Sequence, residues 1–360
     1  MRHLENLDIR NKKIIDAVIE KANNICPGSL ALIGVYGSFA TGDFHEKSDL
    51  DLLVLINDDN GWQLGCTFIQ DDLKVGHDIY CTTWEDLQND SLYNNPNISK
   101  LMDSKIVYCA DMKYADNLEL LRKKVIDILQ APFSMEDYMK AEHMMREAEH
   151  YYMLAMISDD MDDIWAQSGN VIYYIENAVA MLNKKYFHFG TKRTYEELEL
   201  MEKRPQNLCG MIEDVLSANA AGDVKNYLTI LIQETVRVCR ESKEDVLILR
   251  KSVTDDVITG TYEEMYSNWR NKMYSAVQND DRHLAFMSLI SLNEMIADVG
   301  NEADIAKYNV LNGYDSQNLS KTALSFDDTI NEYLKEYKKI GLQVKRYADI
   351  DAFVRGYLRS

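Results

Sequence analysis

Residues Gly37 to Asp51 read GSFATGDFHEKSDLD, and this stretch decides the fold of the N-terminal part of the chain. The apolar run LALIGVY precedes it and the apolar run LLVLI follows it, and short continuous runs of this kind are typical of buried strands. A glycine turn between two strands can hold a polyphosphate through backbone N–H groups. The stretch therefore predicts a strand–loop–strand unit that binds phosphate.

The acidic pair at the end of this stretch, Asp49 and Asp51, has the spacing of one strand face, with Leu50 and Leu52 on the other. Magnesium prefers carboxylate and phosphate oxygens, and two such ions can stabilise the attacking and leaving oxygens of a displacement at phosphorus. Asp78, in GHDIY, is a polar residue among strand formers and would complete the cage from an adjacent strand. We expect these three carboxylates to bind Mg²⁺, with two ions in the site.

The chain as a whole is that of a globular protein with several domains. Its 360 residues suggest two or three domains, and 46% hydrophobic residues are enough for real cores. The sequence contains no apolar run of about 18 residues, no apolar N-terminal signal and no CxxC pair among its six cysteines. We therefore expect no membrane span, reduced thiols and a cytoplasmic location.

The charge balance is strongly acidic, with a formal net charge of -20 and a pI near 4.8. Such a surface repels a phosphate backbone, which argues against a general nucleic-acid partner. It suits a cationic small molecule, although an acidic surface also simply favours solubility.

The pattern of elements divides the chain into an α/β part and a helical part. KKIIDAVIEKA has helical spacing, the two apolar runs are strand-like, and further strands are expected over 74–82 and 105–110. A helix over 114–129 closes this part. Pro132 and the capping pattern Ser134–Asp137 begin a nearly all-helical region, which TDDVITGT interrupts. We expect domains at 1–131, 132–252 and 253–360.

GSFATGDFHEKSDLDLLV resembles the signature of the DNA-polymerase-β-like nucleotidyltransferase superfamily: Gly-Ser, a loop, then Asp-x-Asp in a strand, with a later Asp that Asp78 matches. Within the superfamily the chain looks most like the aminoglycoside and lincosamide nucleotidyltransferases. The resemblance implies an α+β chain, in which a small mixed-sheet catalytic domain precedes an all-α helical bundle that forms the acceptor side of the cleft.

The resemblance also implies phosphate ligands. Ser38 would hold the β- or γ-phosphate with the backbone of Gly37, and Ser48 matches a phosphate-contacting position. Relatives of the kanamycin-modifying type carry a basic residue three positions after the motif serine, where this chain has Thr41. Lys192, in HFGTKRTYEEL, follows a predicted helix and could reach the triphosphate, the alternative being a solvated loop.

The same relatives place a general-base Glu on the first helix of the second domain, with a phosphate-binding Lys four residues later. Glu142 and Arg146 reproduce this spacing, with Arg in place of Lys, and would lie on one helix face. An ordinary surface ion pair is the competing interpretation. Glu147 and Glu149 are rival bases, and other branches use an acid of the first domain.

These patterns predict an Mg²⁺-dependent nucleotidyltransferase that moves a nucleoside monophosphate, AMP from ATP in the first instance, to a hydroxyl of a small molecule, with release of pyrophosphate. An aminoglycoside- or lincosamide-like antibiotic is one such acceptor. The alternatives are modification of a helical partner protein, as in toxin–antitoxin pairs, and a non-catalytic nucleotide-binding protein. A nucleic-acid polymerase would want a basic stripe. The sequence leaves the oligomeric state open.

Overall fold

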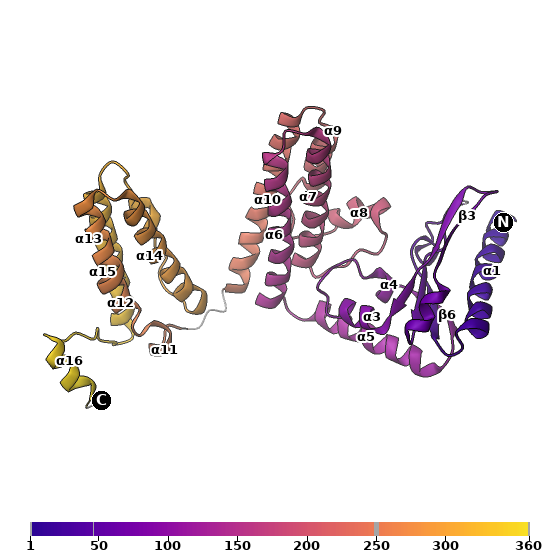
Figure 1. Ribbon diagram of the computed structural model, residues 1–360, viewed down its shortest axis with the longest axis horizontal. Helices are drawn as coiled ribbons and strands as arrows, with labels where there is room; N and C mark the ends of the chain where they lie inside the picture. The colour runs from indigo at the N-terminus through magenta and orange to yellow at the C-terminus, as the bar shows by residue number, and fades with distance from the viewer. Residues whose placement is uncertain (1, 46, 248–251, 359–360) are drawn as a thin grey trace. The chain divides into compact units, whose positions relative to one another are not determined.

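The computed structural model describes residues 2–45, 47–247 and 252–358, and the chain forms two compact units, Met1–Val246 and Leu247–Ser360. The fold is α+β, as the sequence predicts, with a small mixed sheet near the N-terminus followed by helices (Figure 1). Each unit has hydrophobic core clusters of its own. Within the described residues, none of the helices has the length and apolar content needed to cross a membrane.

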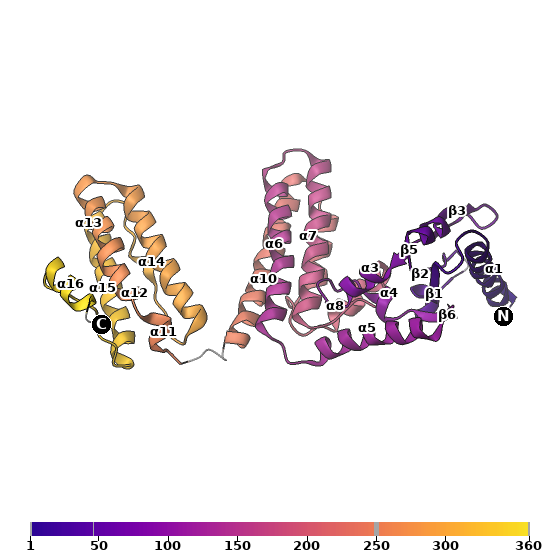
Figure 2. The same ribbon diagram turned by 60° about the horizontal axis from the view of Figure 1, so that its bottom comes forward.

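The main sheet of the first unit has four strands in the order β5-β2-β1-β6 (Figure 2). β1 pairs antiparallel with β2 and with β6, whereas β2 pairs parallel with β5. The predicted apolar runs form its two central strands. The strands are β1 (Leu30–Val35), β2 (Leu52–Ile56), β5 (Cys81–Thr83) and β6 (Lys105–Cys109).

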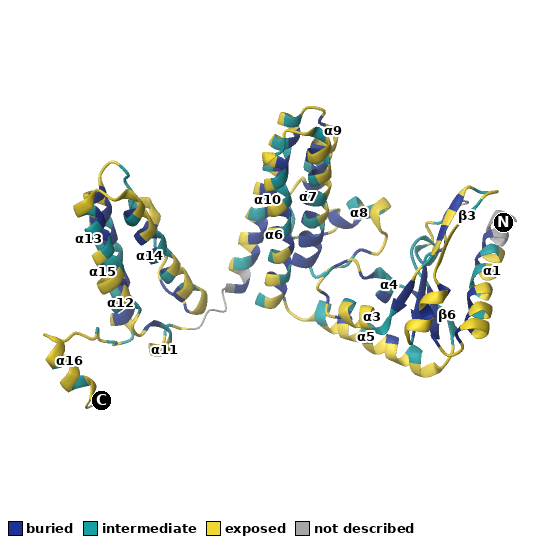
Figure 3. Cartoon of the chain, in the orientation of Figure 1, coloured by how far each residue is buried: buried dark blue, intermediate teal, exposed yellow. Residues whose placement is uncertain are grey.

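Helices cover both faces of this sheet, which explains why its central strands are apolar throughout. Along β2, Leu53 and Leu55 join one core cluster, whereas Leu52, Val54 and Ile56 join the other. The first cluster includes residues of α3 (Trp84–Asp90), α4 (Ser99–Met102) and α5 (Met112–Gln130), and the second includes residues of α1 (Arg2–Ile25). Figure 3 shows these strands in dark blue, in contrast to the exposed β3.

Two expectations about the strands are wrong in detail. β2 begins at Leu52, so Asp49 and Asp51 lie in the extended segment just before the strand. The strand expected over 74–82 is broken at Tyr80 into β4 (Val75–Ile79) and β5, because β4 pairs with β3 (Cys66–Gln70) in a separate two-stranded sheet. Two short helices, α2 (Ser38–Thr41) and η1 (Asp59–Leu64), occupy the connections around β2.

The helical part of the first unit begins where the capping pattern predicts. Ser134 and Asp137 form a reciprocal capping box at the start of α6 (Met135–Ile157). α6 and α7 (Met161–Leu182) are joined by a short turn and lie side by side in Figures 1 and 2. The remaining elements are η2 (Thr191–Arg193), α8 (Thr194–Glu199), α9 (Leu208–Ser217) and α10 (Ala221–Leu247).

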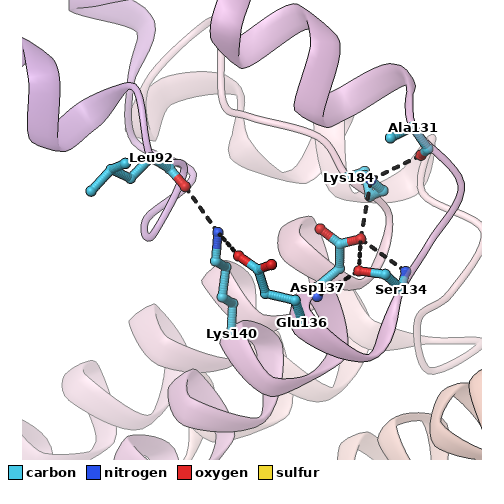
Figure 4. A network of polar contacts seen from close by, with 7 residues as sticks. All are labelled: Leu92, Ala131, Ser134, Glu136, Asp137, Lys140 and Lys184. Atoms are coloured by element: carbon cyan, nitrogen blue, oxygen red, sulfur yellow. Dashed lines mark hydrogen bonds and ion pairs between the residues drawn. The ribbon is translucent and has the colours of Figure 1, made fainter.

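A network of polar contacts ties this bundle to the α/β part (Figure 4). The Lys184 ammonium donates to the Ala131 carbonyl at 2.8 Å and to Asp137 Oδ2 at 3.1 Å, and both side chains of this ion pair are about nine-tenths buried. Nearby, Lys140 Nζ donates to the carbonyl of Leu92, beyond α3, at 2.9 Å. Burial would raise the pKa of Asp137, but the hydrogen bonds from Ser134 and Lys184 lower it.

The second unit is helical and has a core rich in tyrosine. Tyr337 donates to the Ile258 carbonyl at 2.7 Å, and the hydroxyls of Tyr333 and Thr261 lie 2.8 Å apart. Its elements are α11 (Asp255–Ile258), α12 (Thr261–Glu264), the π-helix η3 (Met265–Trp269), α13 (Arg270–Asn279), α14 (Arg282–Glu302), η4 (Val310–Gly313), α15 (Leu319–Lys339) and α16 (Ile350–Tyr357).

We predict that Asp137→Ala lowers the free energy of unfolding by about 3 kcal/mol, because it removes the Asp137 half of the capping box and leaves the buried Lys184 ammonium without its carboxylate. The matched control is Glu136→Ala on the same turn, whose exposed pair with Lys140 contributes only a few tenths of a kcal/mol. Urea unfolding followed by circular dichroism measures both, and equal losses would contradict a structural role for the network.

Candidate active site

The loop between β1 and β2 folds back so that its glycine turn touches the acidic pair. Gly37 has φ 62° and ψ -146°, a conformation essentially restricted to glycine, and α2 follows it directly. A Cβ at this position would lie 2.7 Å from Cγ of Asp51, so only glycine allows the approach. The antiparallel register, with Val35 opposite Leu52 and the Tyr36 N–H donating to the Asp51 carbonyl at 3.1 Å, brings the two segments together.

The first residue of α2 presents an unused hydrogen-bonding group. The hydroxyl of Ser38 is buried and has no hydrogen-bond partner among the described residues. Its backbone N–H donates to the Asp51 carboxylate. A buried hydroxyl of this kind costs free energy unless something bonds to it, so it fits a position that a phosphate oxygen would occupy.

Asp49 and Asp51 occupy one side of the extended segment before β2, while Leu50 between them is buried in the core. Burial and the charge of Asp49 together raise the pKa of Asp51 to about 6, against the opposing effects of the Ser38 N–H and the Lys192 charge. A carboxylate whose ionisation is opposed by burial and by a second carboxylate lies in a site that a cation would stabilise. Their oxygen donors fit Mg²⁺.

Asp78 lies at the same end of the main sheet, although it belongs to β4. In the parallel pairing of β2 with β5, Val54 lies opposite Cys81, so the residues three positions earlier are Asp51 and Asp78. Asp78 Oδ1 accepts from Thr67 Oγ1 at 2.9 Å. Within the described part of the chain, no three His, Cys, Asp or Glu side chains gather closely enough to hold a metal ion, so Asp78 stands apart from the pair.

Tyr36, which the sequence did not single out, lies between the acidic residues. Burial raises the pKa of its phenol to about 12, and the charges of Asp51, Asp49 and Asp78 each add to the rise. The three carboxylates therefore all act on one hydroxyl. A signal was available, because Tyr36 directly precedes the glycine turn and ends an otherwise apolar strand.

α1 supplies a further neighbour of the acidic pair that the sequence did not reveal. Arg10 Nη2 donates to the Ser48 carbonyl at 2.8 Å, while its Nη1 is buried and has no partner among the residues that the structure describes. Burial lowers the pKa of Arg10, and the charge of Asp49 opposes this. Ser48 itself is 3% exposed, and its hydroxyl accepts from the His45 N–H at 2.9 Å, so this side chain holds the loop together.

Residues 12–132 match the family model of the nucleotidyltransferase domain. This segment is therefore similar to nucleotidyltransferase domains, which supports nucleotidyl transfer as its chemistry. A crystal structure of a nucleotidyltransferase-like protein from Exiguobacterium sibiricum 255-15 is similar over 81% of this chain and 92% of that chain, with 14% identity and a TM-score of 0.36. No curated protein matches the chain.

The loop after α7 reaches the nucleotidyltransferase motif from the helical part. Arg193 Nη1 donates to Asp43 Oδ2 at 2.8 Å, which lowers the pKa of Asp43. The charge of the neighbouring Lys192 lowers the pKa of Asp51. The structure therefore brings Lys192 within electrostatic range of Asp51.

Glu142 and Arg146 form the ion pair that was the competing interpretation of their spacing. Arg146 Nη2 lies 2.7 Å from Glu142 Oε2, and Tyr138 donates to Glu142 Oε1 at 3.0 Å. The charge of Glu142 also raises the pKa of Cys239 on α10. Among the described residues these are the contacts of Glu142, and none of them belongs to the motif.

A different acid, Glu176 on α7, lines a cavity next to the loop that carries Lys192. Burial alone raises the pKa of Glu176 to about 7. The sequence contained a signal for it, since Glu176 is the lone acid in the apolar helix VIYYIENAVAML. Its position in a cavity could not be inferred from that pattern.

We predict that Gly37→Ala lowers the free energy of unfolding by about 3 kcal/mol, since it combines a strained backbone with an overlap against Asp51. Gly42→Ala is the matched control, because Gly42 also has a positive φ, of 86°, but nothing lies within 4 Å of a Cβ there. It should cost only about 1 kcal/mol. Thermal unfolding measures the difference, and similar losses would show that the Asp51 contact is unimportant.

We predict that Glu176→Gln stabilises the protein at high pH only. The folded state raises the pKa of Glu176 from 4.5 to about 7, so its stability contribution is complete below pH 4.5 and is lost as the pH rises through 7. Above pH 7 the variant should gain about 3 kcal/mol over the wild type, and below pH 4.5 nothing. Urea unfolding across this range measures it, with the exposed Glu20→Gln as control. A constant difference would be inconsistent with the raised pKa.

Proposed function

We propose that the chain is an Mg²⁺-dependent nucleotidyltransferase, which transfers AMP from ATP to a hydroxyl group of a small molecule and releases pyrophosphate. The observation that supports this most directly is the approach of the Gly37–Ser38 turn, with its unpartnered buried hydroxyl, to Asp51. One end of the site offers donors to phosphate, and the other offers carboxylates to a cation. The motif match over residues 12–132 supports the same chemistry.

Asp49 and Asp51 would hold magnesium, with Asp78 as a further acidic group at the same sheet end. Two Mg²⁺ ions would neutralise the triphosphate and stabilise the attacking and leaving oxygens. The residues of the chain position the substrates around them. The high pKa of Asp51 supports this assignment, because the mutual repulsion of the pair is the condition that a bound cation removes.

Ser38 would donate its hydroxyl to a β- or γ-phosphate oxygen, and the backbone of the Gly37 turn would approach the same phosphates. Lys192 would supply positive charge from the helical part, a proposal that its effect on Asp51 supports. It would take the place of the basic residue that the motif loop lacks at Thr41. Ser48 would hold the motif loop through its hydrogen bond with the His45 N–H. Glu142 and Arg146 would form an ion pair with each other on α6.

We propose a working division into a catalytic domain (1–131), a helical domain (132–252) on the acceptor side and a further helical domain (253–360). The acceptor is a small hydroxylated molecule, and the net charge of -20 suits a cationic one such as an aminoglycoside. A cytoplasmic location follows the same proposal, because ATP is the co-substrate.

We predict that Asp49→Asn/Asp51→Asn weakens Mg²⁺-dependent ATP binding by more than about tenfold, because the cation loses both of its carboxylates. Ser38→Ala should weaken it roughly tenfold through one lost hydrogen bond. Isothermal titration calorimetry with and without EDTA measures both. Asp127→Asn, which changes an exposed acid on α5, is the matched control and should bind as the wild type does.

Two outcomes would reject the proposed function. One is folded wild-type protein that binds no nucleoside triphosphate with or without Mg²⁺. The other is ATP binding that is equally strong in the double variant and in EDTA, because the acidic pair would then have no part in it.

A further inference from the structure

The first unit contains a cavity of about 700 Å³ between α7, the loop that follows it and α9. Its wall includes Gly190–Glu196, the loop that reaches the nucleotidyltransferase motif. No role has been given above to this space. Its volume is that of an ordinary small-molecule site.

The cavity has an aromatic and apolar side. Tyr173, Phe187 and Tyr195 line it together with Ile212 and Leu216. Aromatic walls of this kind bind flat or alicyclic apolar groups by burying area.

The cavity wall also contains polar groups, and one of them is unsatisfied. Asn177 is 1% exposed, and its Oδ1 accepts from Asn97 Nδ2 at 3.0 Å. Its own Nδ2 is buried and has no hydrogen-bond partner within the described residues. An amide donor left unpaired at a cavity wall is costly, and an oxygen of a bound molecule would satisfy it.

Glu176 lies one residue before Asn177 on α7 and lines the same cavity. Burial is the cause of its raised pKa, so no cation of the described structure holds it ionised. The titratable and charged groups that share the cavity wall or feel its charge are Tyr173, Lys192, Arg193, Tyr195, Glu196 and Cys209. Arg193 is paired with Asp43 and Glu196, and Tyr195 donates to Glu213.

Lys192 connects the cavity to the acidic pair. It lines the cavity, and its charge lowers the pKa of Asp51. A molecule in the cavity and a triphosphate at the Gly37–Ser38 turn would therefore both lie near this loop. An acceptor site must lie close to the bound triphosphate, because the two reactants have to meet.

We propose that this cavity is the acceptor site of the nucleotidyl transfer, that it takes an amphipathic small molecule with a hydroxyl beside an apolar ring or chain, and that Glu176 is its general base. The inference rests on the proposed function. The acceptor oxygen forms a bond to the α-phosphorus of ATP, the bond from that phosphorus to the bridging oxygen breaks, and pyrophosphate leaves. The hydroxyl proton passes to the Glu176 carboxylate.

The binding test uses phenyl β-D-glucoside, which joins hydroxyls to an aromatic ring, with D-glucose as the purely polar comparison. We expect ligand-observed NMR to show the glucoside binding at least about tenfold more tightly than glucose. Gly169→Leu fills the cavity, because a side chain at Gly169 meets open space, and should abolish binding. Gly222→Leu, at an equally open helical glycine outside the cavity lining, is the matched control and should bind as the wild type does.

The activity test measures pyrophosphate release from Mg–ATP with a panel of aryl and alkyl glycosides. We expect Glu176→Gln to lower kcat by roughly a hundredfold or more while KM changes little. The rise of kcat/KM with pH near 7 should disappear in the variant, which a merely structural role would not cause.

Calorimetry with Mg–ATP separates this proposal from the function on which it rests. Gly169→Leu and Glu176→Gln should bind Mg–ATP as the wild type does, and loss of Mg–ATP binding in the wild type would instead reject the nucleotidyltransferase itself. With Mg–ATP binding intact, three results would overturn the acceptor site: glucoside binding that survives Gly169→Leu, absence of release with every panel member, or release unaffected by Glu176→Gln.

Discussion

The close approach of the Gly37 turn to the Asp51 carboxylate is the constraint on which the site depends. β1 and β2 pair antiparallel, so the turn that ends one strand meets the acids that begin the other. Because a Cβ would overlap with the carboxylate, the turn must be glycine, and this fixes where Ser38 and α2 begin. The same packing desolvates Asp51 and raises its pKa to about 6. The groups that we propose bind phosphate and cation are thus adjacent before any substrate binds.

A second constraint comes from the helical part, which does not pack separately from the α/β part. One hydrophobic core cluster includes residues of the main sheet, α5 and the bundle helices. The buried pair of Lys184 and Asp137 secures the start of α6 against the end of α7. The loop that follows α7 then brings Arg193 to Asp43 in the motif loop. Stability of the bundle and placement of positive charge at the acidic pair are therefore linked through one segment.

The sequence predicted features that arise from local chemistry. The apolar runs became the central strands because both faces of the sheet are covered, and the Ser134–Asp137 box caps α6 as its spacing requires. Features that depend on tertiary contacts could not be predicted from the sequence. The strand expected over 74–82 divides because β3 pairs with β4, and the partners of Tyr36 are set by the meeting of three segments. Likewise the spacing of Glu142 and Arg146 describes a helix face, and the direction in which that face points is a property of the packed bundle.

Asp51 and Glu176 both have a strongly raised pKa, but the causes of the rise differ, and the difference suggests a division of roles. Burial and the neighbouring charge of Asp49 raise the pKa of Asp51, and a bound cation would lower it again. Burial alone raises the pKa of Glu176, and no cation of the described residues offsets this effect. Near neutral pH this carboxyl therefore readily binds a proton. A carboxyl with a pKa of about 7 exchanges protons readily at that pH, as a general base must. The residues that would bind metal and the residue that would accept the proton are therefore different carboxyls, both near the loop that carries Lys192.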